Sequence, residues 1–108
     1  LAEASEDENI LSMIHFSLLP YVLYSDWNRN ESVLEVTTKL IQSNSMAVNQ
    51  RALTFATAFS QNKNVAKSMA LQYNIYLPAA VKFFDSQTSQ FTYMAIRLCA
   101  NLAPFNSK

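Results

Sequence analysis

Glycine is absent from this chain of 108 residues, while cysteine and histidine occur once each. Without glycine the chain contains neither a glycine-rich dinucleotide fingerprint nor a P-loop for phosphate. The single Cys99 excludes a disulfide framework within the chain and is typical of a reducing, intracellular compartment, either cytoplasmic or nuclear. The single His15 has no carboxylate or thiol at metal-ligand spacing beside it. We therefore expect no metal and no other cofactor.

Acidic side chains are few and unevenly placed. The first ten residues, which include an acidic leader at residues 1–6, carry a formal charge of −4, and the remaining 98 residues carry +4. The mildly basic body weakly favours an acidic partner, but its basic excess is too small to be typical of nucleic-acid binding. No two acids are placed as a catalytic pair, and no base is placed beside Cys99. We therefore expect no enzymatic activity.

One apolar stretch, residues 9–25, carries no formal charge and raises the question of a membrane span. Its apolar part is shorter than the roughly 20 residues that a spanning helix needs, and it contains His15 and Pro20. The N-terminus is acidic, whereas a secretory signal peptide begins with a basic region. The sequence therefore predicts no membrane span and no signal peptide.

Apolar residues recur at helical spacing along the rest of the chain. The spacing predicts helices over residues 6–17, 31–42, 46–60, 65–73, 77–85 and 88–103, with a short helix at residues 20–24 followed by a polar connector at 26–30. We expect Ser45 to cap one helix, Asn74 to end another in a left-handed conformation, and Pro78 to lie in a first turn. The residues expected to face inward are Val33, Leu34, Val36, Thr37, Leu40, Ile41, Val48, Ala52, Leu53, Phe55, Ala56, Phe59, Val65, Met69, Leu71, Ala95, Leu98, Cys99 and Leu102.

The second half of this pattern repeats the first at an offset of 43 residues. Residues 74–103 align with residues 31–60, so that Ala95 falls on Ala52, and the polar turn at residues 86–88 falls on that at 43–45. The other apolar pairs are Leu77 with Leu34, Phe83 with Leu40, Phe84 with Ile41, Ile96 with Leu53, Leu98 with Phe55 and Leu102 with Phe59. A helical repeat of this length predicts an α-solenoid. Its units are residues 31–73 and 74–108, preceded by a partial repeat at 7–30.

The second unit resembles an armadillo repeat. Leu77-Pro78 opens an apolar helix, residues 85–89 form a polar turn, and the last helix ends in AIRLCANLA at residues 95–103. The resemblance covers about residues 31–103. It implies an all-α, right-handed superhelix of short three-helix repeats, with six to seven helices in this chain. It also implies a groove lined by the third helices, in which an Asn near the end of each helix holds an extended peptide.

Asn101 matches that peptide-holding position, while Arg97 replaces the Trp that often lies four residues before it. Tyr93, Arg97 and Asn101 recur every four residues, so we expect them along one face of the last helix. They form either a partner-binding stripe or an ordinary polar face, or Asn101 bonds the backbone of the neighbouring repeat. The corresponding face of the first unit, with Gln50, Arg51 and Thr54, is the second candidate.

The sequence thus predicts a non-catalytic protein-interaction module, a scaffold or adaptor segment of a larger complex that binds a protein or an extended peptide through its groove or its ends. Two alternatives stay open: a peptide-capturing transport or chaperone-cofactor armadillo domain, and a helical bundle that binds a small apolar ligand or lipid. The array has fewer than the about three repeats that a solenoid needs, and its apolar end lacks a polar cap. We therefore expect it to belong to a longer array or to self-associate.

Overall fold

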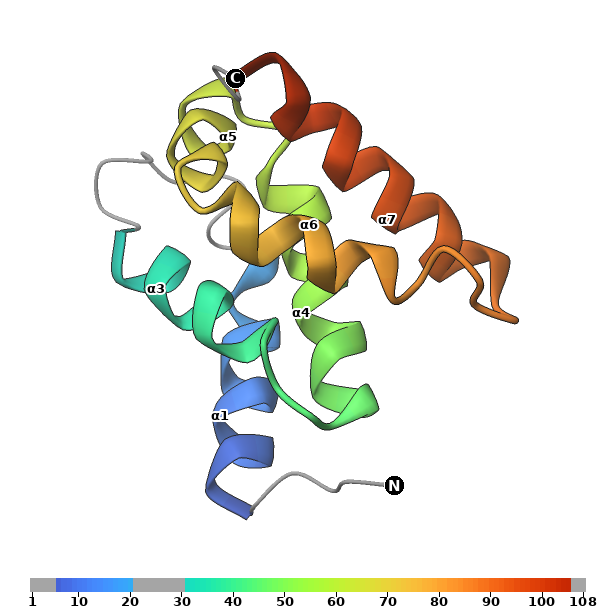
Figure 1. Cartoon of the computed structure of the whole chain (residues 1–108). Coiled ribbons are helices and arrows are strands. Elements are labelled where there is room, and N and C mark those ends of the chain that lie inside the picture. Colours follow the sequence, from blue (N-terminus) through green and yellow to red (C-terminus); the bar gives the residue numbers. More distant parts are fainter. Residues whose placement is uncertain (1–5, 21–30, 106–108) are drawn as a thin grey trace.

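The computed structural model describes residues 6–20 and 31–105, with the side chain of Glu31 excepted (Figure 1). Within these residues every regular element is helical, which confirms the all-α prediction. The elements are α1 (Glu6–Ser17), α3 (Glu31–Leu40), α4 (Met46–Phe59), α5 (Lys63–Ala70), α6 (Tyr73–Val81), α7 (Ser89–Leu102) and a final 3₁₀ turn, η2 (Ala103–Phe105). The predicted connector at residues 26–30, nearly all of the helix at 20–24 and the leader up to residue 5 lie outside the described residues.

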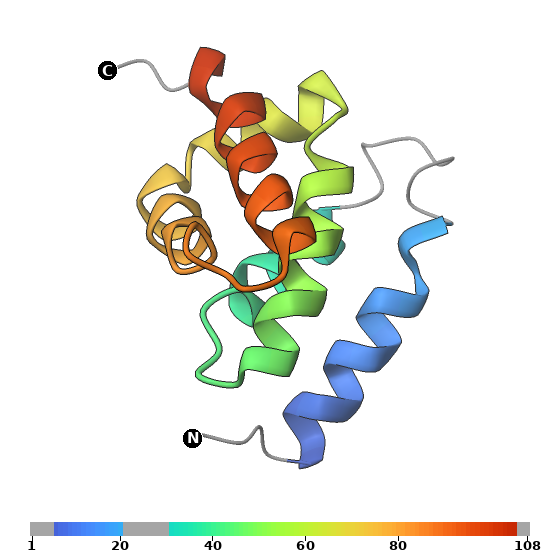
Figure 2. The ribbon, with the colours of Figure 1, turned by 90° about the vertical axis from the view of Figure 1, so that its right-hand side faces the viewer.

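Helix α4 is the centre of the fold. It packs against α1 on one side and α7 on the other, while α3 packs on both α1 and α4. Figure 2 shows α1, α4 and α7 side by side in this order. The residues of α4 that were predicted to face inward are all buried: Val48, Ala52, Leu53, Phe55, Ala56 and Phe59. Each large apolar side chain buried in this way stabilises the fold by about 1.5–3 kcal/mol relative to exposure.

The turn between α3 and α4 is held by polar side chains from α4 and from its cap. Ser45 is the N-cap of α4, as predicted, and its hydroxyl accepts a hydrogen bond from the backbone N–H of Val48 at 3.5 Å. The buried Asn49 donates through Nδ2 to the carbonyl oxygens of Ile41 at 3.2 Å and Leu40 at 3.5 Å. The last carbonyls of a helix lack partners within the helix, so Asn49 compensates for the end of α3.

The boundary between α5 and α6 differs from the prediction. Helix α5 begins two residues early, because Asn62 caps it by accepting from the backbone N–H groups of Asn64 at 2.9 Å and Val65 at 3.3 Å. It also ends early, at Ala70, so Leu71 is 83 % exposed instead of facing inward. Asn74 does not form a left-handed cap, since none of the described residues has a positive φ. It lies in the first turn of α6 instead.

Pro78 lies inside α6 and not in its first turn as predicted. The helix begins upstream of the proline because the carbonyl of Gln72 already accepts from the N–H groups of Ile75 at 2.9 Å and Tyr76 at 3.1 Å. A proline in a helix lacks the N–H that would bond the carbonyl four residues earlier, which here is that of Asn74. Helix α6 ends at Val81, four residues before the predicted end.

Candidate interaction groove

An open hollow of about 300 Å³ is lined by residues of α1, α4 and α7. We call it the interaction groove. Its walls combine two aromatic rings with amide, hydroxyl and guanidinium groups, contributed by Phe16, Ala47, Gln50, Arg51, Thr54, Gln90 and Phe91. The groove therefore offers both hydrogen-bonding groups and apolar contact surface to a bound molecule.

Helix α4 contributes Ala47, Gln50, Arg51 and Thr54 to the lining of the interaction groove. Other residues of the same helix are buried in the core. Gln50 and Thr54 are four residues apart and share one side of the helix. The hydroxyl oxygen of Thr54 lies 2.9 Å from the carbonyl oxygen of Gln50 and 3.3 Å from Sδ of Met94 on α7. One turn further along, Thr57 Oγ1 donates to the carbonyl oxygen of Met94 at 3.1 Å. These contacts hold α4 and α7 together beneath the groove.

Arg51 of α4 forms hydrogen bonds with α1, which forms another wall of the interaction groove. Its Nη1 donates to Oδ1 of Asn9 at 3.0 Å and lies 3.4 Å from Oγ of Ser12, both on α1. Both partners are neutral, so these hydrogen bonds orient the guanidinium without neutralising its charge. A guanidinium carries five N–H donors in a planar fork that suits a carboxylate. Arg51 is therefore positioned to bind an acidic group in the groove.

The three candidate residues on α7 do not line the interaction groove. The side chain of Tyr93 is 64 % exposed, and Arg97 is exposed as well. Asn101 is half-buried, and its Nδ2 donates to Oγ of Ser60 at the end of α4 at 2.9 Å. Ser60 Oγ in turn donates to the carbonyl of Thr57 at 2.9 Å. The amide of Asn101 thus bonds a side chain at the end of α4, whereas the alternative interpretation of the sequence expected it to bond backbone.

The structure therefore brings Gln50, Arg51 and Thr54 together and places Tyr93, Arg97 and Asn101 apart from them. It adds Gln90, which the sequence interpretation missed. Gln90 lies seven residues before Arg97, and a helix makes nearly two turns over that distance. The two side chains consequently share one side of α7. This spacing is the signal that could have extended the predicted stripe to the beginning of the helix.

His15 is a packed core residue and does not line the interaction groove. Its ring stacks on Phe55 with centroids 3.9 Å apart, and its Nε2 lies 2.7 Å from Oγ1 of Thr37. Because the Thr37 hydroxyl donates to the carbonyl of Val33 at 2.8 Å, Nε2 must carry the proton of the ring. Burial lowers the pKa of His15 to about 4, so the ring is neutral at pH 7. Burial has the opposite effect on a thiol, whose charged form is the deprotonated one, and it raises the pKa of the half-buried Cys99.

Comparison of the chain with protein-family models, with curated protein sequences and with solved structures gave no match. Among residues 6–20 and 31–105, no group of three or more His, Cys, Asp or Glu side chains is arranged to hold a metal ion. In the same part of the chain, no helix is sufficiently long and apolar to span a bilayer.

Proposed function

We propose that this chain is a segment of an armadillo-like α-solenoid and acts as a non-catalytic protein-interaction module inside the cell, with an extended peptide bound in the interaction groove. The repeated helix pairs of the sequence support the solenoid, as does the order in which α1, α4 and α7 pack. Behind them, α3 and α6 are linked by the hydroxyls of Thr38 and Tyr76 at 2.7 Å. Corresponding helices of successive units would then be neighbours throughout.

The single observation that carries the binding proposal is the convergence of Gln50, Arg51 and Gln90 on one open hollow. An extended peptide exposes backbone N–H and C=O groups along its whole length. A glutamine side chain can satisfy both kinds, since its amide both donates and accepts. Arg51 adds a preference for Asp or Glu in the peptide, and the rings of Phe16 and Phe91 provide apolar contact. The partner would be a protein with an acidic, extended segment.

A peptide-display screen on the immobilised chain tests this proposal. The library holds unstructured peptides of random sequence, and those retained should be enriched in acidic residues. For a retained peptide, Arg51→Ala should raise the Kd roughly 5- to 30-fold, which corresponds to about 1–2 kcal/mol at an interface arginine. The double variant Gln50→Ala/Gln90→Ala should also weaken binding. Lys67→Ala removes an exposed cation of α5 and is the matched control. Equal affinity of all variants would contradict the proposal.

A hollow with apolar walls bears on the alternative of a small apolar ligand. It has a volume of about 180 Å³ and lies between α1 and α3, lined by Leu11, Ile14, His15, Leu18, Ser32, Val33 and Val36. Pockets for small molecules usually have volumes of about 300–1,000 Å³. This hollow is smaller than that range, which disfavours it as a site for a small apolar ligand.

A further inference from the structure

Two positions of the internal repeat are buried in the first unit and exposed in the second. Ile41 is 1 % exposed, whereas its counterpart Phe84 is 40 % exposed. Leu53 is fully buried, whereas its counterpart Ile96 is 54 % exposed. In the first unit, α4 packs against α7, and α3 is linked to α6 by the hydroxyl pair of Thr38 and Tyr76. The second unit thus presents the same kind of apolar face without a cover among the described residues.

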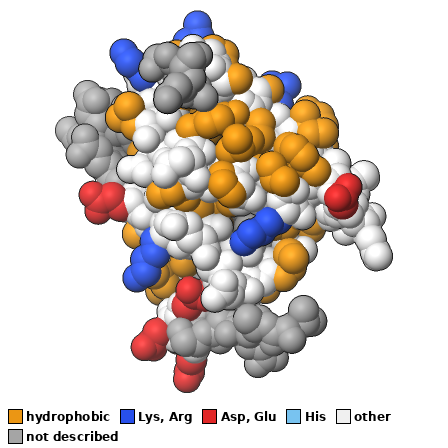
Figure 3. All heavy atoms as spheres, viewed as in Figure 1, with side chains coloured by type: hydrophobic (Ala, Val, Ile, Leu, Met, Phe, Trp, Pro, Cys, Tyr) orange, Lys and Arg blue, Asp and Glu red, His pale blue; other side chains and the backbone are white. Residues whose placement is uncertain are grey.

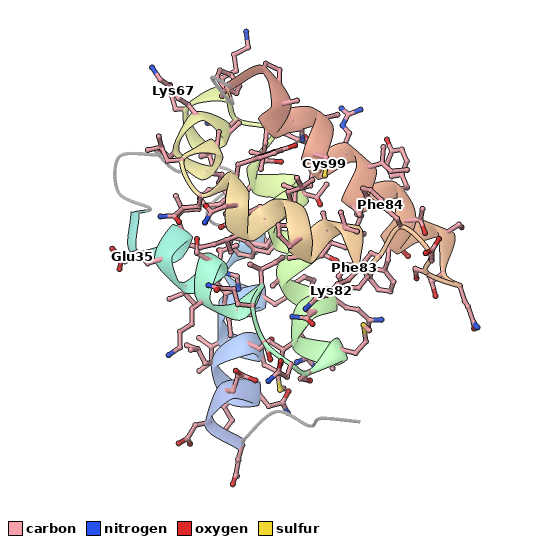
Figure 4. All side chains as sticks on the ribbon, viewed as in Figure 1. Glu35, Lys67, Lys82, Phe83, Phe84 and Cys99 are labelled. Atoms are coloured by element: carbon pink, nitrogen blue, oxygen red, sulfur yellow. The ribbon has the colours of Figure 1, made fainter. Side chains whose placement is uncertain are left out.

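This exposed surface, which we call the α6–α7 face, consists of Val81, Phe84, Tyr93 and Ile96. Each of these side chains is at least 40 % exposed. Figure 3 shows hydrophobic side chains gathered over α6 and α7, and Figure 4 shows Phe84 and Cys99 on this side of the molecule with Lys82 beside them. The cations Lys82 and Arg97 are both exposed and outnumber the one nearby acid, Asp85.

A second exposed apolar surface lies at the opposite end of the molecule, on α1. Ile10, Ile14 and Leu18 are 47, 55 and 39 % exposed. Beside them is the hollow of about 180 Å³ between α1 and α3. We call this surface the α1 face. In Figure 2, α1 lies on one side of α4, and α6 and α7 lie on the other. The first turn of α1 is acidic, with Glu6, Asp7 and Glu8.

We propose that the α6–α7 face of one copy of this chain binds the α1 face of a second copy, head to tail. The rings and branched side chains of Phe84 and Ile96 project from one face, while the other offers an apolar hollow that can receive such a side chain. The charges beside the two faces are opposite in sign, and such complementarity selects the partner and the orientation. A symmetric contact between two α6–α7 faces would instead bring Lys82 and Arg97 near their own copies.

Head-to-tail binding has a specific consequence for assembly. The two faces lie at opposite ends of the chain, so each bound copy leaves one face open for another. Heterologous contacts of this kind produce a ring if the rotation closes and a filament if it does not. None of the residues that line the interaction groove belongs to either face. The self-association proposal is therefore independent of peptide binding.

Complementation between two blocked variants tests the proposal on the full chain. Phe84→Glu/Ile96→Glu blocks the α6–α7 face, and Ile14→Glu/Leu18→Glu blocks the α1 face. In sedimentation equilibrium the unmodified chain should grow in mass with concentration, and each variant alone should remain at the 12.2 kDa of one chain. Their equimolar mixture should form a 1:1 dimer that grows no further, because each variant keeps the face that the other lacks. Leu71→Glu alters an exposed apolar residue outside both faces and should assemble like the unmodified chain.

A pair of substitutions at exposed charged residues provides a second test if a blocked variant does not fold. Lys82→Glu/Arg97→Glu changes only exposed charges, and it should weaken assembly, as should added salt. Circular dichroism checks the helix content of every variant. The proposal is overturned if the unmodified chain stays monomeric up to its solubility limit. It is also overturned if the chain assembles but the mixture of folded blocked variants does not yield the dimer, because the contact would then not join these two faces.

Discussion

His15 Nε2 lies 2.7 Å from Thr37 Oγ1, and this contact links α1 to α3 inside the protein. The ring of His15 is 3 % exposed, and Thr37 is fully buried. Because the Thr37 hydroxyl donates to the carbonyl of Val33, the imidazole is the donor in this pair. Within the described residues, the other ring nitrogen, Nδ1, has no hydrogen-bond partner. The site therefore suits a neutral ring and disfavours a second proton.

This preference makes stability depend on pH. The folded-state pKa of His15 is lowered from 6.5 to about 4, so between these values the unfolded chain binds more protons than the folded one. The stabilisation is complete above pH 6.5 and is lost as the pH falls to about 4. We expect a loss on the order of 3 kcal/mol, because the two pKa values differ by about 2.5 and a pKa difference of one is equivalent to about 1.4 kcal/mol.

Urea denaturation at a series of pH values measures this effect. His15→Phe is the control, since a phenyl ring can keep the stack on Phe55 and leaves the Thr37 hydroxyl bonded to Val33. The variant should lose this part of the pH dependence, and the difference between the two curves is attributed to His15. Parallel curves for both proteins would show that His15 binds protons equally in the folded and unfolded states.

Asn49 should contribute to stability through the end of α3. Replacing it by Ala leaves the carbonyls of Leu40 and Ile41 without the Nδ2 donor in a buried setting. An unsatisfied buried polar group costs about 1–3 kcal/mol, and we expect a loss of that size in the free energy of unfolding. Asn44→Ala, at an exposed position in the same turn, should change it by less than about 0.5 kcal/mol. Equal effects of the two substitutions would contradict this role of Asn49.

Phe55 should be the most sensitive of the large side chains in α4. It is fully buried, stacks on His15 and meets Phe59 edge-on with ring centroids 5.5 Å apart. Phe55→Ala should cost about 3–5 kcal/mol, a large share of the roughly 5–15 kcal/mol that stabilises a typical domain. Phe84→Ala removes the same atoms from a residue that is 40 % exposed and should cost clearly less at low protein concentration. Thermal melts of both variants provide the comparison.

Asn101 has a structural contact that can be separated from a binding role. Asn101→Ala and Ser60→Ala should each lower the stability by about 0.5–1.5 kcal/mol. The double variant should lose less than the sum, since both substitutions remove the same hydrogen bond. If Asn101→Ala instead left the stability unchanged and abolished binding of a peptide selected on the chain, its role would be the peptide-holding one that the armadillo resemblance implies.

The sequence alone determined most of the helical framework, because helix spacing and capping are local properties. The bounds of α1 and the inward face of α4 followed from apolar periodicity, and Ser45 followed from its capping chemistry. The bounds of α7 were predicted to within one residue at each end. The errors lie at the boundaries of α5 and α6, where α6 also ended at Val81, four residues before its predicted end. Asn62 began α5 earlier than expected, and Asn74 was incorporated into α6.

Only some residues of the candidate site could be predicted from the sequence. Gln50, Arg51 and Thr54 were predicted as one surface, and all three line the interaction groove because a single helix carries them. A periodic pattern does not state which helices are neighbours. It therefore could not predict that Gln90 and Phe16 line the same groove, or that Asn101 bonds Ser60.

Only the tertiary structure decided which apolar stripes are covered. Leu53 and Ile96 occupy equivalent positions in the repeat, yet one is fully buried and the other is 54 % exposed. The amphipathic pattern of a helix identifies its apolar side. That side is buried only if a second element packs against it. For α4 the packed elements are α1, α3 and α7, whereas the outer face of α6 and α7 has no cover among the described residues.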